Sequence, residues 1–166
     1  MLAELCSIVG MHALSPTAKV LYLYLLPHNK VELSRRDIAR QLGFRFENAP
    51  NLHYALEELK EVGLLEYLGT PQQGRQTPFR LLNRNAPMDF KGRKLRSLPA
   101  KLHEESPTVQ ASYLYLLGTS GSRTTKEVES ALGVSYIGAY RALRRLLEVE
   151  LIRHAEGQNP QRFMLQ

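Results

Sequence analysis

Apolar and polar positions in the first half of the chain predict three helices followed by a hairpin. Residues 16–26 are apolar on most sides, so we expect a helix that lies between other elements and ends at Pro27. A short strand is expected at 29–33. Apolar residues at three-to-four spacing then predict amphipathic helices at 34–42 and at about 48–62, separated by Gly43. Short apolar strands at 64–68 and 78–82 flank a polar hairpin tip.

The same order of patterns returns in the second half. We expect a helix at 108–117, and a second helix that Thr124 caps with Glu127 at the capping-box position. Gly133 marks a turn, and Ser135 begins a third helix. The strands 150–154 and 162–165 then flank a polar tip at 155–161.

The residues themselves repeat, which predicts a duplication. The segment Ser15-Pro16-Thr17 returns as Ser106-Pro107-Thr108, 91 positions later. The Leu-Gly pair at Gly43 returns at Gly133, 90 positions later, and the offset then falls to 87 in the third helix. Offsets that change only where loops are expected are typical of two diverged copies of one globular unit.

A helix, a short strand, a helix, a turn, a helix and a hairpin, in this order, resemble the winged helix-turn-helix family. The segment 124–152 carries the more typical pattern, whereas the first copy has three extra residues near Glu47. The resemblance implies a mainly α fold with small β-hairpin wings (α+β), in two tandem winged-helix domains. We place domain 1 with an N-terminal helix at 1–82, a basic connector at 83–105 and domain 2 at 106–166.

Charge adds a candidate partner to this picture. The net charge is +6, and residues 83–105 hold 6 basic and 3 acidic groups, which is half of the excess. Such a basic connector suits a polyanion, although a charged linker also keeps a protein soluble. Four of these 6 basic groups lie close together, at Lys91, Arg93, Lys94 and Arg96.

The third helix of the second copy is the strongest candidate site. Its spacing predicts that Ile137, Tyr140, Leu143 and Leu147 face the core. The opposite face would then show Ser135, Tyr136, Gly138, Ala139, Arg141, Ala142 and Arg145, with Arg144 beside it. The resemblance implies that this helix enters the major groove of DNA, and that Arg123 and Lys126 contact phosphates. The two arginines of an amphipathic helix can also be its ordinary solvated side.

We expect the first copy to bind DNA more weakly. The third helix of that copy offers Asn51, His53 and Tyr54, but also two carboxylates, Glu57 and Glu58, which would repel phosphates. Further cations precede it at Arg35, Arg36, Arg40 and Arg45. The wings add Arg75 and Arg162 with several amides, which suit the minor groove but also any solvated hairpin.

These patterns predict a double-stranded DNA-binding protein, and a sequence-specific transcriptional regulator is the leading hypothesis. A plasmid-type replication initiator, and a non-enzymatic assembly or segregation scaffold that binds protein through domain 1 or the N-terminal helix, are the alternatives. No catalytic motif, metal spacing or cofactor loop occurs, so we expect no enzymatic activity, no metal and no cofactor. We also expect no membrane span, no secretory signal and a cytoplasmic location.

Overall fold

The computed structural model describes residues 13–28, 35–44, 49–70, 79–82, 97–157 and 160–166. The first half contains three helices and a two-stranded sheet: α1 (Pro16–Leu25), α2 (Arg35–Leu42), α3 (Ala49–Glu61), β1 (Leu65–Tyr67) and β2 (Phe79–Leu81). A short 3-10 turn, η4 (Ala100–Leu102), precedes the second half. There the elements are α4 (Pro107–Gly118), β3 (Arg123–Thr124), α5 (Thr125–Leu132), α6 (Tyr136–Glu148), β4 (Ile152–His154) and β5 (Arg162–Leu165).

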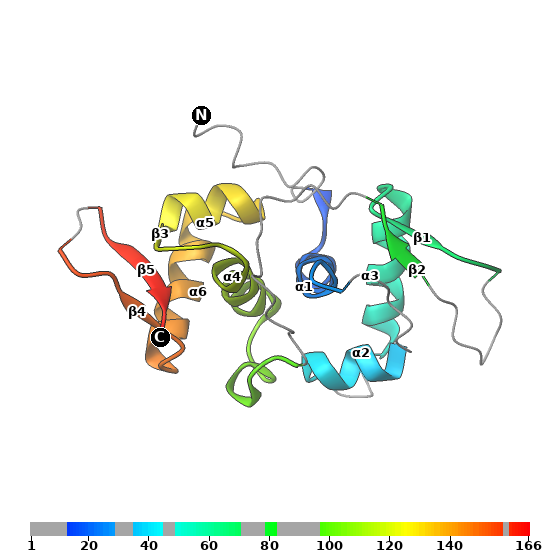
Figure 1. The fold of residues 1–166 in the computed structure, drawn as a ribbon, viewed down its shortest axis with the longest axis horizontal. Coiled ribbons are helices and arrows are strands. Elements are labelled where there is room, and N and C mark those ends of the chain that lie inside the picture. The colour runs from blue at the N-terminus through cyan, green and yellow to red at the C-terminus, as the bar shows by residue number, and fades with distance from the viewer. Residues whose placement is uncertain (1–12, 29–34, 45–48, 71–78, 83–96, 158–159) are drawn as a thin grey trace.

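Helices α1 and α4 lie side by side at the centre of the molecule (Figure 1). Each begins at a serine whose hydroxyl accepts a hydrogen bond from a backbone N–H, and each has a proline in its first turn. Both are buried on nearly all sides, as the apolar pattern of the first of them predicts, because each is covered by its own half and by the other helix.

One hydrophobic core joins the two halves. A single cluster of buried side chains includes Leu21 of α1, Leu56 of α3, Leu114 of α4 and Leu143 of α6. The end of the predicted connector also belongs to it, because Leu98 and Leu102 are buried. The Leu98 N–H donates to the Gln41 carbonyl, so this segment is attached to the end of α2.

In the first half, α2 ends at Gly43, whose φ of 71° lies in the left-handed region where glycine is favoured. Helix α3 follows and packs on both α1 and α2. Strands β1 and β2 then pair in antiparallel fashion with Leu65 opposite Leu81. The short strand predicted at 29–33 lies outside the described residues.

In the second half, the predicted capping box is confirmed. The Thr124 hydroxyl accepts from the Glu127 N–H at 3.2 Å, and the Glu127 carboxylate accepts from the Thr124 N–H at 2.7 Å. Gly133 then adopts the left-handed conformation, with φ 58°, before α6. Strand β5 pairs with β3 on one side and β4 on the other, which gives the sheet order β3-β5-β4.

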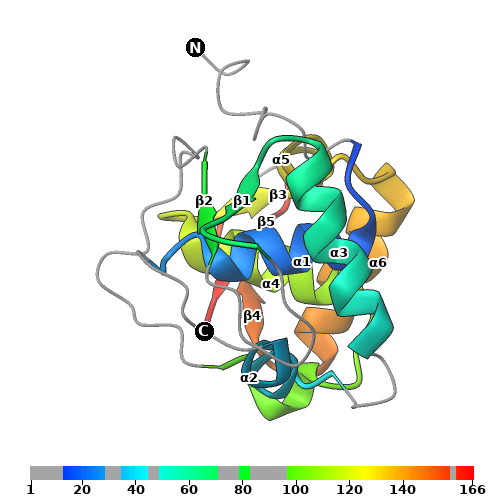
Figure 2. The same ribbon diagram turned by 90° about the vertical axis from the view of Figure 1, so that its right-hand side faces the viewer.

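The order of three helices and a hairpin therefore occurs twice among the described elements. Figure 1 shows α3 and α6 on opposite flanks of the central α1–α4 pair, with α3 beside α1 and α6 beside α4, and in Figure 2 α3 lies in front of α6. The boundaries proposed for two domains stay a prediction. No helix in the described parts of the chain is long and apolar enough to cross a membrane.

Candidate nucleic-acid interface

Helix α6 is positioned by the turn that precedes it. Ser135 is its N-cap, and the Ser135 hydroxyl accepts a hydrogen bond from the Gly138 N–H at 3.1 Å. The Ser135 side chain, predicted to contact DNA, is therefore engaged in starting the helix. A Cβ at position 138 would meet this hydroxyl oxygen at 3.1 Å, so glycine suits the tight start.

The predicted core face of α6 is correct at Leu143, which is buried, and at Leu147, which is partly buried against the core, but it is wrong in the first part of the helix. The buried residues are Ala139, Ala142, Leu143 and Leu146. Ile137 and Tyr140, which we expected inside, are 61% and 42% exposed. Small alanines let α6 approach α4 and α5 closely, and the larger apolar side chains are left on the outer side.

The outer side of α6 carries a mixed aromatic, aliphatic and basic surface. With 3.6 residues per turn, positions 137, 140, 141 and 144 fall on one side of the helix, with Tyr136 at the edge. Tyr136 is 53% exposed, and Arg141 and Arg144 are exposed as well. We call this surface the α6 face; it consists of Tyr136, Ile137, Tyr140, Arg141 and Arg144.

Arg141 and Arg144 differ from Arg123, Arg145 and Arg162 in their surroundings. Neither makes a hydrogen bond or an ion pair with any residue in the described ranges. Two cations one turn apart that hold no internal partner can approach an anion without breaking an interaction within the fold.

Arg145, by contrast, has two internal partners. Its guanidinium lies 2.8 Å from the Glu105 carboxylate and 3.2 Å from that of Glu148. Hydrogen bonds from Arg145 to Glu105 and then to Glu148 raise the Arg145 pKa. The residue joins α6 to the segment before α4, so its predicted DNA contact competes with these pairs.

Arg162 and Arg123 are also engaged within the fold. The Arg162 guanidinium donates to the Ser122 carbonyl at 2.9 Å and lies 3.1 Å from the Glu127 carboxylate. Arg123 donates to the same carbonyl at 3.1 Å. Burial raises the Glu127 pKa, but hydrogen bonds from Thr124 and the charges of Arg162 and Arg123 outweigh it, so the pKa is lowered. The Arg162 side chain thus fastens β5 to α5.

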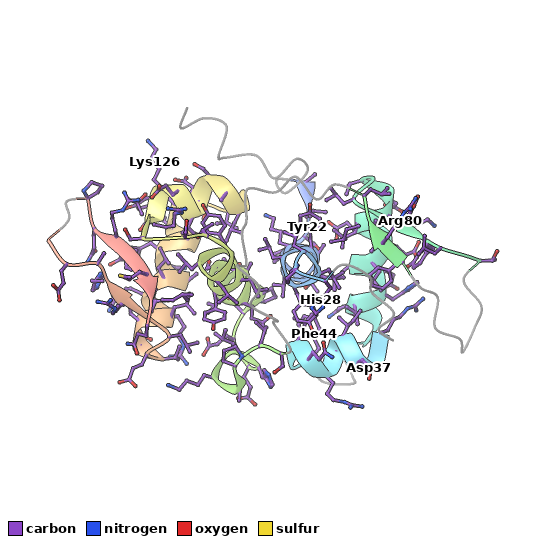
Figure 3. The ribbon with its side chains drawn as sticks, viewed as in Figure 1. Tyr22, His28, Asp37, Phe44, Arg80 and Lys126 are labelled. Carbon is purple, nitrogen blue, oxygen red and sulfur yellow. The ribbon has the colours of Figure 1, made fainter. Side chains whose placement is uncertain are left out.

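Lys126 projects away from the molecule at the start of α5 (Figure 3). It is exposed, and no partner for it occurs among the residues described. Its position in the first turn of the helix before α6 leaves the predicted phosphate contact open.

The third helix of the first half, α3, presents fewer charges outward than predicted. Asn51 is exposed and Tyr54 is 68% exposed, while His53 is half-buried, with an Nδ1 that has no partner among the described atoms. Glu58 has a partner within the fold, because its carboxylate accepts hydrogen bonds from the Ser15 N–H and hydroxyl at 2.5 and 2.6 Å.

Glu57 is likewise engaged, because it accepts a hydrogen bond from the Tyr67 hydroxyl at 2.9 Å. Burial, and then this bond, raise the Tyr67 pKa to about 12. Both carboxylates of α3 therefore hold partners within the fold, and their repulsion of a phosphate backbone stays a prediction. Glu58 caps α1, and Glu57 fastens the β1 strand to α3.

The other predicted contacts are only partly described. Arg35 is exposed at the first residue of α2. The Arg36 side chain and six further cations lie outside the described residues: Arg45, Arg75, Lys91, Arg93, Lys94 and Arg96. Within the described ranges, no three His, Cys, Asp or Glu residues gather in a way that could hold a metal ion.

The structure adds Ile137 and Tyr140 to the candidate surface. The sequence held a signal for them, because residues 139, 142, 143 and 146 form an equally regular apolar stripe. The larger side chains of Ile and Tyr favoured the other phase.

Part of the chain is similar to a known family. Residues 110–165 match the model of a family described as "Sugar-specific transcriptional regulator TrmB", a winged helix-turn-helix family. The match runs from α4 to β5 and supports a winged-helix transcriptional regulator. The matched family is one of regulators and not of enzymes. Neither curated proteins nor solved structures gave a match to the chain.

Proposed function

We propose that this protein is a transcriptional regulator that binds double-stranded DNA with α6 in the major groove. The observation that carries the proposal is the α6 face, where Arg141 and Arg144 are exposed and hold no partner among the described residues. The match of residues 110–165 to a family of transcriptional regulators supports the same class.

The chemistry of the α6 face suits a groove that mixes charge and apolar groups. An arginine can donate two hydrogen bonds to a guanine edge, and an aliphatic side chain can contact a thymine methyl. Tyrosine hydroxyls donate to phosphate oxygens. We assign the arginines to bases or phosphates, Ile137 to thymine, and Tyr136 and Tyr140 to the backbone on either side.

The first half is proposed to contact the same duplex more weakly. Helices α3 and α6 flank the central helices on opposite sides (Figure 1), so the two third helices would contact separate stretches of the duplex. Asn51 can pair with adenine, while Tyr54 can contact phosphate. Arg35, Lys126 and the cations of the connector and wings would add contacts to phosphates.

A protein-binding role is the second candidate, and one observation favours it. Tyr54, Tyr136, Ile137 and Tyr140 are large apolar residues that are exposed on the two third helices. Aromatic side chains are enriched in protein interfaces, and such an interface would suit an assembly subunit. The arginines of the α6 face would then be of secondary importance.

Fluorescence anisotropy with a random duplex at two salt concentrations tests the proposal. We expect Arg141→Ala combined with Arg144→Ala to weaken binding at least about tenfold, which is about 1.4 kcal/mol, and to reduce the salt dependence. The control is Lys60→Ala combined with Arg80→Ala, which removes two exposed charges that pair with Glu57 and Glu66 and that the proposal does not assign to DNA. Equal effects of the two double variants, or no binding of the unaltered protein at low salt, would favour the protein-binding role.

A replication initiator would share this DNA-binding chemistry. Selection of bound fragments from a random oligonucleotide pool distinguishes a defined motif from general affinity, and it shows whether one half-site or two are used. For a regulator we expect a motif with one strong half-site, contacted by α6, and a weaker one about one helical turn away.

A further inference from the structure

The turn before α6 is held by a side chain from the other half of the molecule. Lys19 of α1 is 5% exposed, and its ammonium group donates a hydrogen bond to the Gly133 carbonyl at 3.1 Å. Gly133 ends α5, and Ser135, the N-cap of α6, follows two residues later. The last carbonyls of a helix have no partner within that helix, and a cation stabilises them. The contact therefore joins the first half directly to the start of α6.

Lys19 is also linked to the third helix of its own half. Glu58 of α3 accepts from the Ser15 N–H and hydroxyl at the start of α1, four residues before Lys19. Burial lowers the Lys19 pKa, and the negative charge of Glu58 partly offsets this effect by favouring the ammonium form. A continuous series of contacts thus leads from α3 through Ser15 and Lys19 to the Gly133 turn and α6.

The repeat shows that a half of this fold does not need the lysine. Gln110 occupies the equivalent place in α4, since both residues stand four positions after the N-cap serine of their helix. The Gln110 Nε2 donates to the Leu102 carbonyl at 2.8 Å, in the turn that leads into α4. This bond stays on its own side of the molecule, whereas the bond of Lys19 crosses to the other half.

A buried ammonium group costs free energy, which argues for a role other than stability. Lysine is almost never fully buried, and replacing buried charges by apolar side chains of similar volume is often neutral or stabilising. A hydrogen bond from an ammonium group is directional, however, whereas the apolar packing of α1 on α4 is not. The Lys19 contact can therefore fix where the Gly133 turn lies, which apolar packing alone leaves less defined.

The corresponding turn of the first half is held in a comparable way. The His103 ring lies against Gly43, where a Cβ atom would meet the His103 Cγ at 2.2 Å. His103 belongs to the segment that leads into α4, and its Nε2 lies 3.0 Å from the Leu98 carbonyl. The Leu98 N–H donates to the Gln41 carbonyl near the end of α2. Each of the two glycine turns is thus in contact with a residue from outside its own three helices.

We propose that Lys19 is a positioning residue, which holds α6 at a fixed place relative to α3 and thereby sets the spacing of the two half-sites that the protein binds. The place of α6 follows from contacts within the protein, whereas the spacing of half-sites rests on the proposed function. With Lys19 present the two third helices form one rigid unit, so a duplex with a different spacing engages only one of them.

The place of α6 is tested without DNA, by double electron–electron resonance between spin labels attached through Tyr54→Cys in α3 and Ile137→Cys in α6. These side chains are 68% and 61% exposed, and Cys6, the one cysteine of the chain, is replaced by serine. We expect a narrow distance distribution with Lys19, and a broader or displaced one in Lys19→Met, which removes the ammonium at similar volume. Gln110→Met, at the equivalent position of the repeat, is the matched control and should leave the distribution unchanged.

A melting curve separates positioning from stability. If Lys19→Met lowers the melting temperature but leaves the distance distribution unchanged, Lys19 only stabilises the core and the inference fails. If Lys19→Met does not give a native far-UV circular dichroism spectrum, Lys19→Gln is the variant to measure, because α4 forms with glutamine at this place. The same broadening is expected for it, and an unchanged distribution would again contradict the inference.

The consequence for DNA is measured by fluorescence anisotropy on duplexes that carry the two half-sites from the oligonucleotide selection, with their separation changed one base pair at a time. We expect Lys19→Met to reduce the preference for the best separation by about fivefold or more. Its affinity for a duplex with the α6 half-site alone should stay unchanged. An unchanged preference would overturn the inference. If no duplex binds the unaltered protein, the proposed function fails, and the spin-label distance alone decides whether Lys19 positions α6.

Discussion

Glu150 has a backbone conformation that L-residues rarely adopt. Its φ of 58° places it in the left-handed region at the end of α6, just before the hairpin. The equivalent residue in the first half is Gly63, 87 positions earlier, with a φ of 75°. The same turn thus occurs in both halves, but only the first has the residue that fits it without strain.

We expect Glu150→Gly to stabilise the protein by about 1 kcal/mol, because the left-handed strain is relieved. The measurement is the free energy of unfolding in urea. The matched change, Gly63→Ala, should destabilise by a similar amount, since it introduces the same strain in the first half. A loss of stability in Glu150→Gly would mean that the glutamate side chain makes a contribution larger than the strain.

At the scale of the element, the capping box of α5 combines backbone and charge. Glu127 accepts from the Thr124 N–H and is paired with Arg162 of β5, so one carboxylate fixes both the start of the helix and the sheet beside it. These contacts favour the ionised form of the Glu127 carboxylate, so its pKa is lowered.

Glu127→Gln should therefore destabilise the protein by about 1 kcal/mol near neutral pH. The folded-state pKa of Glu127 lies below its ordinary 4.5, so the stabilisation by the ionised carboxylate is complete above 4.5. It is lost as the pH falls through the lowered folded-state value. Urea unfolding at a series of pH values should show the difference between the two proteins shrinking in acid. Glu129→Gln, in the same helix, serves as the neutral-pH control and should change stability little.

The phase of α6 yields a second prediction for an element. Leu146→Ala should cost about 2–5 kcal/mol, because Leu146 is fully buried. Ile137→Ala, on the α6 face, should change stability by less than about 0.5 kcal/mol while weakening DNA binding, as urea unfolding and fluorescence anisotropy would measure. A large loss of stability in Ile137→Ala would show that Ile137 belongs to the core, as the sequence pattern predicted.

At the scale of the whole molecule, the shared core predicts cooperative unfolding. Helices α1 and α4 bury each other, and the Lys19 ammonium joins α1 to the Gly133 turn. Halves of this size have small cores, and each would expose much of its central helix if they were separated.

We expect one thermal transition for the full chain, with Leu21→Ala in α1 and Leu132→Ala in α5 lowering the same midpoint. Each deletes a fully buried leucine and should cost about 2–5 kcal/mol. Far-UV circular dichroism and NMR signals from both halves would report the transition. Two separate transitions, each moved by only one of the variants, would show that the halves unfold independently.

Local features were predictable from the sequence because they depend on neighbours along the chain. The Ser-Pro starts of α1 and α4, the Thr124–Glu127 capping box, the glycine turns and the hairpin strands are encoded within a few residues. The repeat of these signals predicted the repeated order of elements. The boundaries of two domains and the contacts with DNA remain predictions.

Other features depended on contacts that no local pattern specifies. Ala139 and Ala142 face inward because α6 lies close to α4 and α5, and this distance is set by packing across the molecule. Arg145, Arg162, Glu57 and Glu58 found partners that are 10 to 43 residues away, so their availability for a ligand could not be predicted from local spacing. The amino-acid sequence alone determined the elements and their repetition, through short-range capping and periodicity. Tertiary structure decided which polar groups stay available, since within the described residues long-range partners engage Arg145 and Arg162 but not Arg141 and Arg144.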